Sequence, residues 1–265
     1  MKRMITTRRT SLYIAIAMGL AMIGGSLAVA APPPKPTISE DASNAVALMG
    51  KTLLAKEFSF RARTIRPYAY ENGVLLHVGH DFRITVRRPD RLLIDVNGDD
   101  GRRKLFYDGK TVALALDPSG SEYATLPVPD TITMMMYVVM GRFGLDFPLA
   151  DFLTDTPDKA FLHGVSSGRL VNKVTIDGVP CLHLVFSQPP GIELELWLEA
   201  ERGVPRRLIV IDNDSPGKPN FIAEMSDWDF TVHPADADFT FAPPNGAKEV
   251  DLGAALSGQQ TGAPQ

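Results

Sequence analysis

Cysteine is almost absent from this chain of 265 residues, in which Cys181 stands alone. One cysteine can form neither an internal disulfide nor a multi-cysteine metal site. An excess of positive charge is also missing, since 27 basic residues face 31 acidic ones, and this argues against a nucleic-acid-binding surface. Phosphate-loop, dinucleotide, nucleophile-elbow and His-Glu-Xaa-Xaa-His zinc motifs do not occur. We therefore expect no cofactor, no metal and no enzyme activity of a familiar type.

The first thirty residues have the pattern of a secretory signal peptide. Residues 1–10 carry four basic residues and no acidic one, residues 12–27 are apolar, and Ala28-Val29-Ala30 offers a small-residue cleavage site. A membrane anchor is the alternative, but several glycines dilute an apolar run that is already short for a span. A paired arginine, Arg8-Arg9, leaves the export route open between the general and twin-arginine pathways.

Removal of residues 1–30 would leave 23 basic and 31 acidic residues, a formal charge of −8. Because no cysteine lies near the cleavage site, a lipid anchor is not expected there. We expect a periplasmic protein that begins with a flexible proline-rich linker over residues 31–37. A single domain over residues 38–250 and a disordered tail over residues 251–265 would follow.

The mature chain opens with one helix and continues with strands. Thr37-Ile38-Ser39-Glu40 resembles a capping box in which Thr37 accepts and Glu40 reaches back, and helical spacing of apolar residues predicts a helix over residues 38–56. From Phe58 the period changes to two. Residues 74–87 and 192–199 alternate between apolar and polar side chains, as strands of an antiparallel sheet with one wet face do. We expect about ten strands.

A second helical segment is unusual because it has almost no polar face. Residues 131–141 contain Met134-Met135-Met136-Tyr137-Val138-Val139-Met140, and residues 149–153 form a short further piece. Such a helix is either buried or covers something apolar. Methionine adapts its shape, so this segment can re-pack around variable ligands or can simply fill gaps in the core.

The balance of sheet and helix predicts the architecture. About ten strands make a wide sheet that twists and curls, and its apolar face needs a cover. We expect a mainly β, α+β protein: a half-open antiparallel β-barrel with an N-terminal helix and a helical lid. Whatever the helices leave unfilled is an apolar cavity suited to an acyl chain. The alternative is that the protein's own side chains fill this space completely.

Candidate catalytic residues are few. Cys181 and His183 share one strand face, but side chains two apart on a strand point in parallel, and no third group orients them. His80 lies among apolar neighbours and is either a satisfied core histidine or a polar contact for a ligand head group. Arg61, Arg63 and Arg66 form a basic stripe that is either one solvated strand face or a rim for lipid phosphates.

Several short motifs, in their order and spacing, resemble the LolA family of periplasmic lipoprotein carriers. They are Arg88-Pro89-Asp90-Arg91-Leu92, then Asp108-Gly109-Lys110-Thr111, and Phe239-Thr240-Phe241-Ala242-Pro243-Pro244-Asn245-Gly246-Ala247 near the end. The segment from Trp197-Leu198-Glu199 to Gly203-Val204-Pro205-Arg206-Arg207 resembles the broader superfamily, which includes LolB and the RseB sensor domain. The resemblance covers about residues 40–250, and the chain is similar to an uncharacterised exported branch.

This resemblance implies a half-open barrel, a helical lid and a cavity for acyl chains. Arg88 matches the arginine that latches the lid of LolA. Leu92 stands where LolA has an aromatic residue that helps it avoid returning its cargo, and the Met-rich segment has no close LolA counterpart. The cavity is expected to be lined by Val78, His80, Phe82, Ile84, Leu92, Ile94, Leu194 and Leu196, and the lid to present Met134, Met135, Met136, Tyr137 and Met140.

The sequence therefore predicts a non-enzymatic periplasmic carrier or binder of a lipid or lipidated protein. A membrane-bound donor or acceptor protein is a further expected partner, and nucleic acid is not. The alternatives are an RseB-like sensor that engages a membrane partner and, more remotely, a hydrolase with an atypical site at Cys181 and His183.

Overall fold

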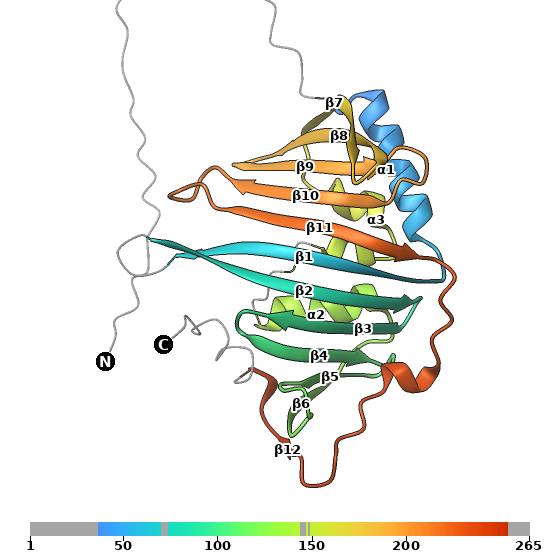
Figure 1. The fold of residues 1–265 in the computed structure, drawn as a ribbon, viewed down its shortest axis with the longest axis vertical. Coiled ribbons are helices and arrows are strands. Elements are labelled where there is room, and N and C mark those ends of the chain that lie inside the picture. The colour runs from blue at the N-terminus through green and yellow to red at the C-terminus, as the bar shows by residue number, and fades with distance from the viewer. Residues whose placement is uncertain (1–36, 70–73, 144–146, 148, 254–265) are drawn as a thin grey trace, which may run out of the picture. The chain divides into compact units, whose positions relative to one another are not determined.

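Twelve strands form one curved sheet in the computed structural model, which describes residues 37–69, 74–143, 147 and 149–253 (Figure 1). Across the sheet they follow the order β12-β6-β5-β4-β3-β2-β1-β11-β10-β9-β8-β7. Their bounds are β1 Glu57–Ala69, β2 Leu75–Arg87, β3 Arg91–Gly98, β4 Gly101–Tyr107, β5 Thr111–Ala115, β6 Glu122–Pro127, β7 Ser167–Ile176, β8 Val179–Gln188, β9 Ile192–Glu199, β10 Pro205–Asp212, β11 Asn220–Asp229 and β12 Lys248–Glu249.

Every neighbouring pair is antiparallel except the short β12–β6 pair, which is parallel. The prediction of a mainly β, mostly antiparallel fold is confirmed, with twelve strands in place of about ten. Strands β12 and β7 form opposite edges, and within the described residues no pairing joins them. The expected signal peptide, linker residues 31–36 and tail residues 254–265 lie outside the described part of the chain.

The pairing of β1 with β11 joins two meanders. Strands β1 to β6 follow one another outward in one direction, and β7 to β11 return from the far edge to β1. The helical segments lie between the two meanders in sequence: α2 Ile132–Phe143, the 3-10 helix η2 Ala150–Leu153 and α3 Pro157–Phe161. Together with α1 Glu40–Leu53, they cover one face of the sheet, which we call the inner face (Figure 1).

Strict alternation in the central strands places large apolar side chains on the inner face. In β1, Phe58, Phe60 and Ala62 are buried, whereas Arg61 and Arg63, on the opposite side of the strand, are exposed. In β2, Ile84 and Val86 are buried in the same manner. Each such side chain removes apolar surface from water, and the resulting core is what holds the helices against the sheet.

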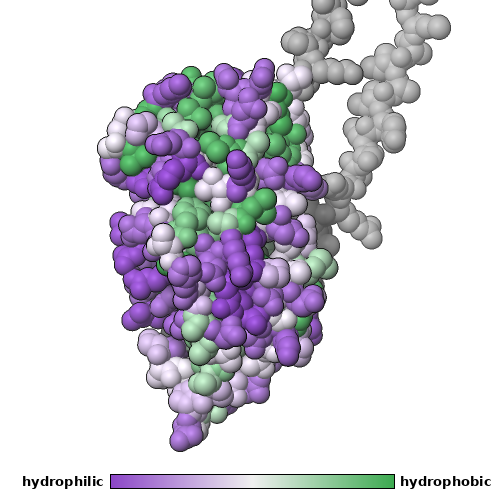
Figure 2. Space-filling model, turned by 90° about the vertical axis from the view of Figure 1, so that its right-hand side faces the viewer, coloured by the Kyte–Doolittle hydropathy of each residue, from purple (hydrophilic) through white to green (hydrophobic). Residues whose placement is uncertain are grey.

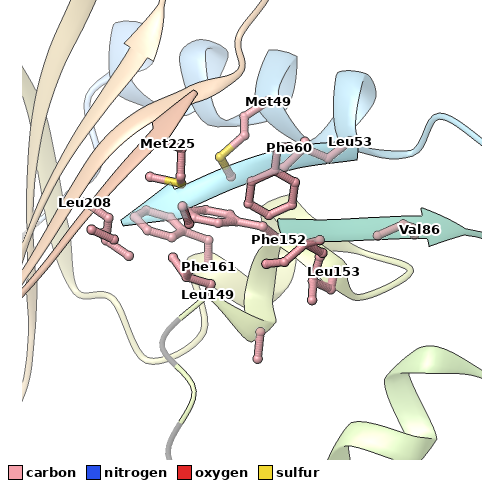
Figure 3. Packing of buried hydrophobic residues seen from close by; sticks show 14 of the residues in the cluster. Met49, Leu53, Phe60, Val86, Leu149, Phe152, Leu153, Phe161, Leu208 and Met225 are labelled. Carbon is pink, nitrogen blue, oxygen red and sulfur yellow. The ribbon is translucent and has the colours of Figure 1, made fainter. Parts of the chain in front are cut away.

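The segment η2–α3 fills the part of the inner face that lies beneath α1. Figure 3 shows Phe152, Leu153 and Phe161 surrounded by side chains of α1 and of the central strands. These three residues are at most 4% exposed. The protein's own side chains therefore occupy much of the concavity that the sequence predicts, and any cavity has to lie to one side of this plug.

Helix α1 begins later than predicted. Its N-cap is Ser39, whose hydroxyl oxygen accepts a hydrogen bond from the Ala42 amide over 3.3 Å, so the prediction that Thr37 caps the helix is wrong. The carbonyl of Thr37 instead accepts from the amide of Gly168, and the amide of Ser39 donates to the carbonyl of Gly168. Pairing with the β7 edge holds residues 37–39 extended, and the helix starts only after it.

Two motifs from the sequence have clear structural roles. Asp177 and Gly178, with φ of 48° and 79°, form the tight turn between β7 and β8 that an Asp-Gly pair favours. Near the C-terminus, Phe239 is buried under the guanidinium of Arg87, and Phe241 lies against Phe106 and Tyr123. The Phe-Thr-Phe motif thus fastens the final segment to strands β2 to β6.

Apolar surface is unevenly distributed. Figure 2 shows that apolar residues gather mainly in the upper half of that view, the half that holds α1 and strands β7–β10, while the lower half is largely polar. Among the described residues, no helix has the length and apolar character needed to cross a membrane.

Candidate functional site

A groove of about 760 Å³ lies between helix α2 and the inner face of β9 and β10. Its floor is aliphatic, with Ile192, Leu194, Leu208 and Val210. One wall is the face of α2 that carries Met136, Tyr137 and Met140, and the opposite wall comes from η2 and α3. The full lining is Thr133, Met136, Tyr137, Met140, Gly141, Ala150, Asp151, Thr154, Thr156, Lys159, Ala160, Phe161, His163, Gln188, Ile192, Leu194, Leu208 and Val210. We call this the α2 groove.

Helix α2 has a buried side and an exposed side. Ile132, Met135, Met136 and Val139 are buried against the core. Tyr137, on the groove side, is 70% exposed, and Met134, which does not line the groove, is 49% exposed. Large apolar side chains left exposed on a helix are costly in water unless something else covers them. The Met-rich segment is therefore both core and groove wall.

The start of α2 is fixed firmly. The amide of Ile132 donates to the carbonyl of Pro89 over 2.8 Å, and the hydroxyl of Thr133 donates to the carboxylate of Asp155 over 3.0 Å. The Asp155 amide in turn donates to the Thr133 hydroxyl. These bonds tie the first turn of α2 both to the β2–β3 turn and to the connection between η2 and α3, so one end of the groove wall is held in place.

Arg88 links three elements from the end of β2. Its guanidinium donates to the carbonyl of Leu53 at the end of α1 over 3.1 Å, to that of Leu153 over 2.7 Å and to that of Phe152 over 3.4 Å. It also lies 5.7 Å above the ring of Phe58. Burial lowers the pKa of Arg88 to about 10, partly offset by the charge of Asp155, so the side chain stays protonated at neutral pH.

The resemblance to LolA implied that Arg88 latches a lid. In the structure, Arg88 bonds to α1 and η2, and it is the neighbouring Pro89 that bonds to α2. Arg88 thus holds the plug, and the next residue, Pro89, holds the Met-rich helix.

Asp151 is the charged residue set most deeply into the α2 groove. Burial raises the pKa of its carboxyl group above the ordinary value, and attraction to His163 partly opposes this. Within the described residues, its carboxylate accepts no hydrogen bond, whereas the exposed Lys159 and His163 lie farther out on the same wall. A desolvated carboxylate beside aliphatic side chains is a costly arrangement.

The predicted cavity residues do not all meet. Leu194 lines the α2 groove together with Met136, Tyr137 and Met140. Ile84, Leu92 and Leu196 are at most 1% exposed and belong to the packed core, in the same cluster as Phe152 and Phe161 of the η2–α3 plug. Met135, predicted for the lid, is 2% exposed and also packs in the core.

Four further predicted residues lie in or near the other half of the inner face. Phe82 packs against Phe147, with ring centroids 5.9 Å apart, and Ile94 is 8% exposed. Val78 lies farther along β2 and is half-buried. His80 is also half-buried, and its Nε2 lies 2.8 Å from the carboxylate of Asp100, so it has a protein partner. None of these four residues lines the α2 groove.

Cys181 and His183 do not form a pair. The thiol of Cys181 is fully buried and donates to the carbonyl of Val179, and burial raises its pKa. His183 Nε2 lies 2.8 Å from the carboxylate of Glu195, and its ring stacks on Trp197 at 4.1 Å. No cluster of three or more His, Cys, Asp or Glu side chains able to hold a metal occurs within the described residues.

A second hollow, of about 600 Å³, lies over the middle of the sheet and is lined mainly by charged side chains. Arg61 and Arg63 line it and pair with Asp227 and Asp81, at 3.3 and 3.0 Å. The expected basic stripe is split, since Arg66 lies over the ring of Phe221, with 5.3 Å between its guanidinium carbon and the ring centroid. Because the arginines of this hollow are paired with carboxylates of the protein, they are less available to a ligand. The α2 groove is therefore the better candidate site.

Sequence reasoning missed the wall formed by η2 and α3. Asp151, Lys159 and His163 carry no motif, and they come from three different local structures: the 3-10 helix η2, helix α3 and the turn that follows α3. Only the folded path of residues 150–163 brings them to the groove.

Comparison with known proteins identifies the family of this chain. The model of the family DUF2092, described as a predicted periplasmic protein, matches residues 43–253. A search of curated proteins found no match.

Three solved structures illustrate the likeness. A LolA superfamily protein from Nitrosomonas europaea is 11% identical, with 74% of this chain and 97% of that chain covered and a TM-score of 0.35. The lipoprotein LppX of Mycobacterium tuberculosis is 14% identical, with 74% and 99% covered and a TM-score of 0.43. MucB in the MucA/MucB complex of Pseudomonas aeruginosa is 18% identical, with 76% and 61% covered and a TM-score of 0.42. This chain thus spans less than two thirds of MucB, and the LolA superfamily that its motifs resemble is represented among similar structures.

Proposed function

Because this chain belongs to the DUF2092 family of predicted periplasmic proteins, we propose that it is a periplasmic carrier that holds an acyl chain in the α2 groove. The observation that carries the proposal is the groove itself: an aliphatic floor from β9 and β10 faces a methionine- and tyrosine-bearing wall from α2 across about 760 Å³. Pockets for small molecules have volumes of about 300–1,000 Å³ and mainly apolar linings.

The exposed side chains of α2 support the same proposal. Tyr137 leaves 70% of its surface in solvent although it borders an aliphatic floor. A hydrocarbon chain in the groove would cover Tyr137 and Met140, and burial of apolar area contributes about 25 cal/mol per Å². Methionine side chains can re-pack around chains of different length. The ligand thus completes a core that the protein alone leaves open.

The curved sheet would act as a half-open barrel, with the η2–α3 plug closing one part and α2 covering the other. The first turn of α2 is fixed to Pro89 and Asp155, so opening of the groove would move the opposite end of the helix. Arg88 keeps the plug in place during that movement. The cargo would be a lipid or the acyl chains of a lipidated protein, and a membrane-bound donor or acceptor would exchange it.

We propose no catalytic role. The separate partners of the two side chains support this proposal, since the thiol of Cys181 donates to the carbonyl of Val179 and the imidazole of His183 pairs with Glu195. Export without a lipid anchor completes the proposal, since a carrier that moves between membranes has to be free of both.

Titration with a fluorescent fatty acid tests the groove. Tyr137→Asp places a charge beside the bound chain and should weaken binding about tenfold or more. Since Tyr137 is largely exposed, the melting temperature should stay close to that of the unchanged protein. Met134→Asp is the matched control, because Met134 lies on the same helix, is 49% exposed and does not line the groove. Equal effects of both variants on binding would contradict the proposal.

Native mass spectrometry of protein purified from the periplasm gives an independent test. Co-purified lipid in the unchanged protein, and its loss from Tyr137→Asp, would support a carrier. A stable complex with a membrane protein and no lipid would favour a sensor instead. Turnover of an ester substrate that Cys181→Ala or His183→Ala abolishes would favour a hydrolase.

A further inference from the structure

The wall of the α2 groove opposite α2 carries charges of both signs. Asp151 comes from η2, Lys159 from α3 and His163 from the turn that follows α3. With Tyr137 on α2, these are the titratable groups in the groove lining. Charged side chains do not favour the binding of a hydrocarbon chain, and the carboxylate in particular is costly to desolvate.

The carboxylate of this wall is less exposed to solvent than its two nitrogen-bearing side chains. Asp151 is half-buried, whereas Lys159 and His163 are exposed at the rim. Within the described residues, the Asp151 side chain accepts no hydrogen bond, and its one resolved electrostatic partner is His163. A half-buried carboxylate in this situation is ready to accept a charged donor from a ligand.

The charges of Asp151 and Lys159 limit which lipid head groups fit the groove. A fatty-acid carboxylate would suit Lys159 but would be repelled by Asp151. An anionic phosphate with a neutral alcohol would leave Asp151 without a cation. A head group that carries both a phosphate and a primary ammonium matches both signs, because the ammonium can donate up to three hydrogen bonds.

We propose that the α2 groove selects lipids with a zwitterionic aminophosphate head group, with the ammonium held by Asp151 and the phosphate by Lys159 and His163. This inference rests on the proposed function, since it assigns the head group of the lipid whose acyl chain occupies the same groove. Selection comes from the deeper carboxylate, and Lys159 and His163 at the rim contribute hydrogen bonds to the phosphate of any phospholipid.

Two lysolipids with the same palmitoyl chain test the selection: lysophosphatidylethanolamine and lysophosphatidylglycerol, each used to displace a fluorescent fatty acid. They share the phosphate and differ in the ammonium. The unchanged protein should prefer lysophosphatidylethanolamine about tenfold, the value of one charge-assisted hydrogen bond in a partly buried site. Asp151→Asn should reduce the ratio of the two affinities to about one while binding of the fluorescent fatty acid persists.

Two further variants complete the design. Lys159→Gln should weaken both lysolipids about equally, by roughly threefold, because the rim cation is exposed. Asp81→Asn removes a carboxylate from the opposite face of the sheet and should leave the preference unchanged. No preference in the unchanged protein, or a preference that survives Asp151→Asn, would overturn the head-group assignment and leave the acyl-chain groove standing. Failure to bind the fluorescent fatty acid at all would overturn the proposed function and this inference together.

Discussion

The guanidinium of Arg88 donates a hydrogen bond of 2.7 Å to the carbonyl oxygen of Leu153 and so joins the end of β2 to the plug on the inner face. The same side chain also reaches the carbonyls of Leu53 and Phe152. These carbonyls belong to the ends of α1 and η2, where the last peptide groups have no partner within their own helix. Arg88 therefore satisfies helix ends that would otherwise be buried without a donor.

Replacement of Arg88 by glutamine should destabilise the protein by about 2–4 kcal/mol, because hydrogen bonds from a charged group are lost and buried carbonyls remain unpaired. Arg63→Gln is the matched control: its guanidinium pairs with Asp81 at an exposed site, and its loss should cost less than about 1 kcal/mol. Urea unfolding of both variants measures the difference. A small, equal loss would mean that Arg88 does not hold the plug.

Gly203 marks a close contact between the β9–β10 turn and α1. Its φ is +70°, and a Cβ atom there would lie 2.7 Å from Leu48 Cγ and 3.0 Å from the Met49 amide nitrogen. Gly178 also has a positive φ, of +79°, but a Cβ atom there would meet nothing within 4 Å. Both substitutions put a side chain at a positive φ, but only the alanine at position 203 would also clash with α1. Gly203→Ala should therefore destabilise the protein by about 1–2 kcal/mol more than Gly178→Ala. Similar values for the two variants would show that α1 moves freely aside.

Asp151 predicts a pH dependence of stability. Since burial raises its pKa, the folded state binds a proton more tightly than the unfolded chain, and this carboxyl group costs stability as the pH rises above its ordinary pKa of about 4. Asp151→Asn removes the cost, so it should raise the free energy of unfolding at pH 7. The gain should vanish at a pH below that ordinary value, where the carboxyl group is protonated in both states. A loss of stability at pH 7 would show that Asp151 has a stabilising partner.

Cys181 should resist modification in the folded protein. Its thiol is fully buried, and its raised pKa keeps the thiolate population small at neutral pH. A thiol reagent applied at pH 8 should label the protein only after denaturation. Rapid labelling of the native protein, together with a loss of labelling in His183→Ala, would favour a reactive pair and a catalytic site.

Much of the sheet could be predicted from the sequence because alternation is a local property. Residues 74–87 and 192–199 become β2 and β9 with little change of bounds, and the Asp177-Gly178 turn forms as its residue types require. The start of α1 could not be predicted, because the competing partner of Thr37 is Gly168, more than a hundred residues away in sequence.

The candidate site was predictable only in part. The apolar face of β9 and the Met-rich helix could be recognised, and Leu194, Met136, Tyr137 and Met140 do meet at one groove. Periodicity identifies which side chains of a strand face inward but not what covers them. Ile84 and Leu196 face inward as expected, yet Phe152 and Phe161 belong to the plug that packs with them. Which inward-facing side chains are covered depends on how the η2–α3 segment crosses the sheet.

Photo-crosslinking would identify the side chains that surround a bound acyl chain. A palmitic acid analogue with a diazirine near the end of its chain would be bound to the unchanged protein, irradiated and mapped by peptide mass spectrometry. We expect adducts on peptides of α2 and of β9–β10, around Met140, Leu194 and Val210. These adducts should be lost from Tyr137→Asp but not from Met134→Asp. Adducts that fall mainly on other strands, or that persist unchanged in Tyr137→Asp, would contradict acyl-chain binding in the α2 groove.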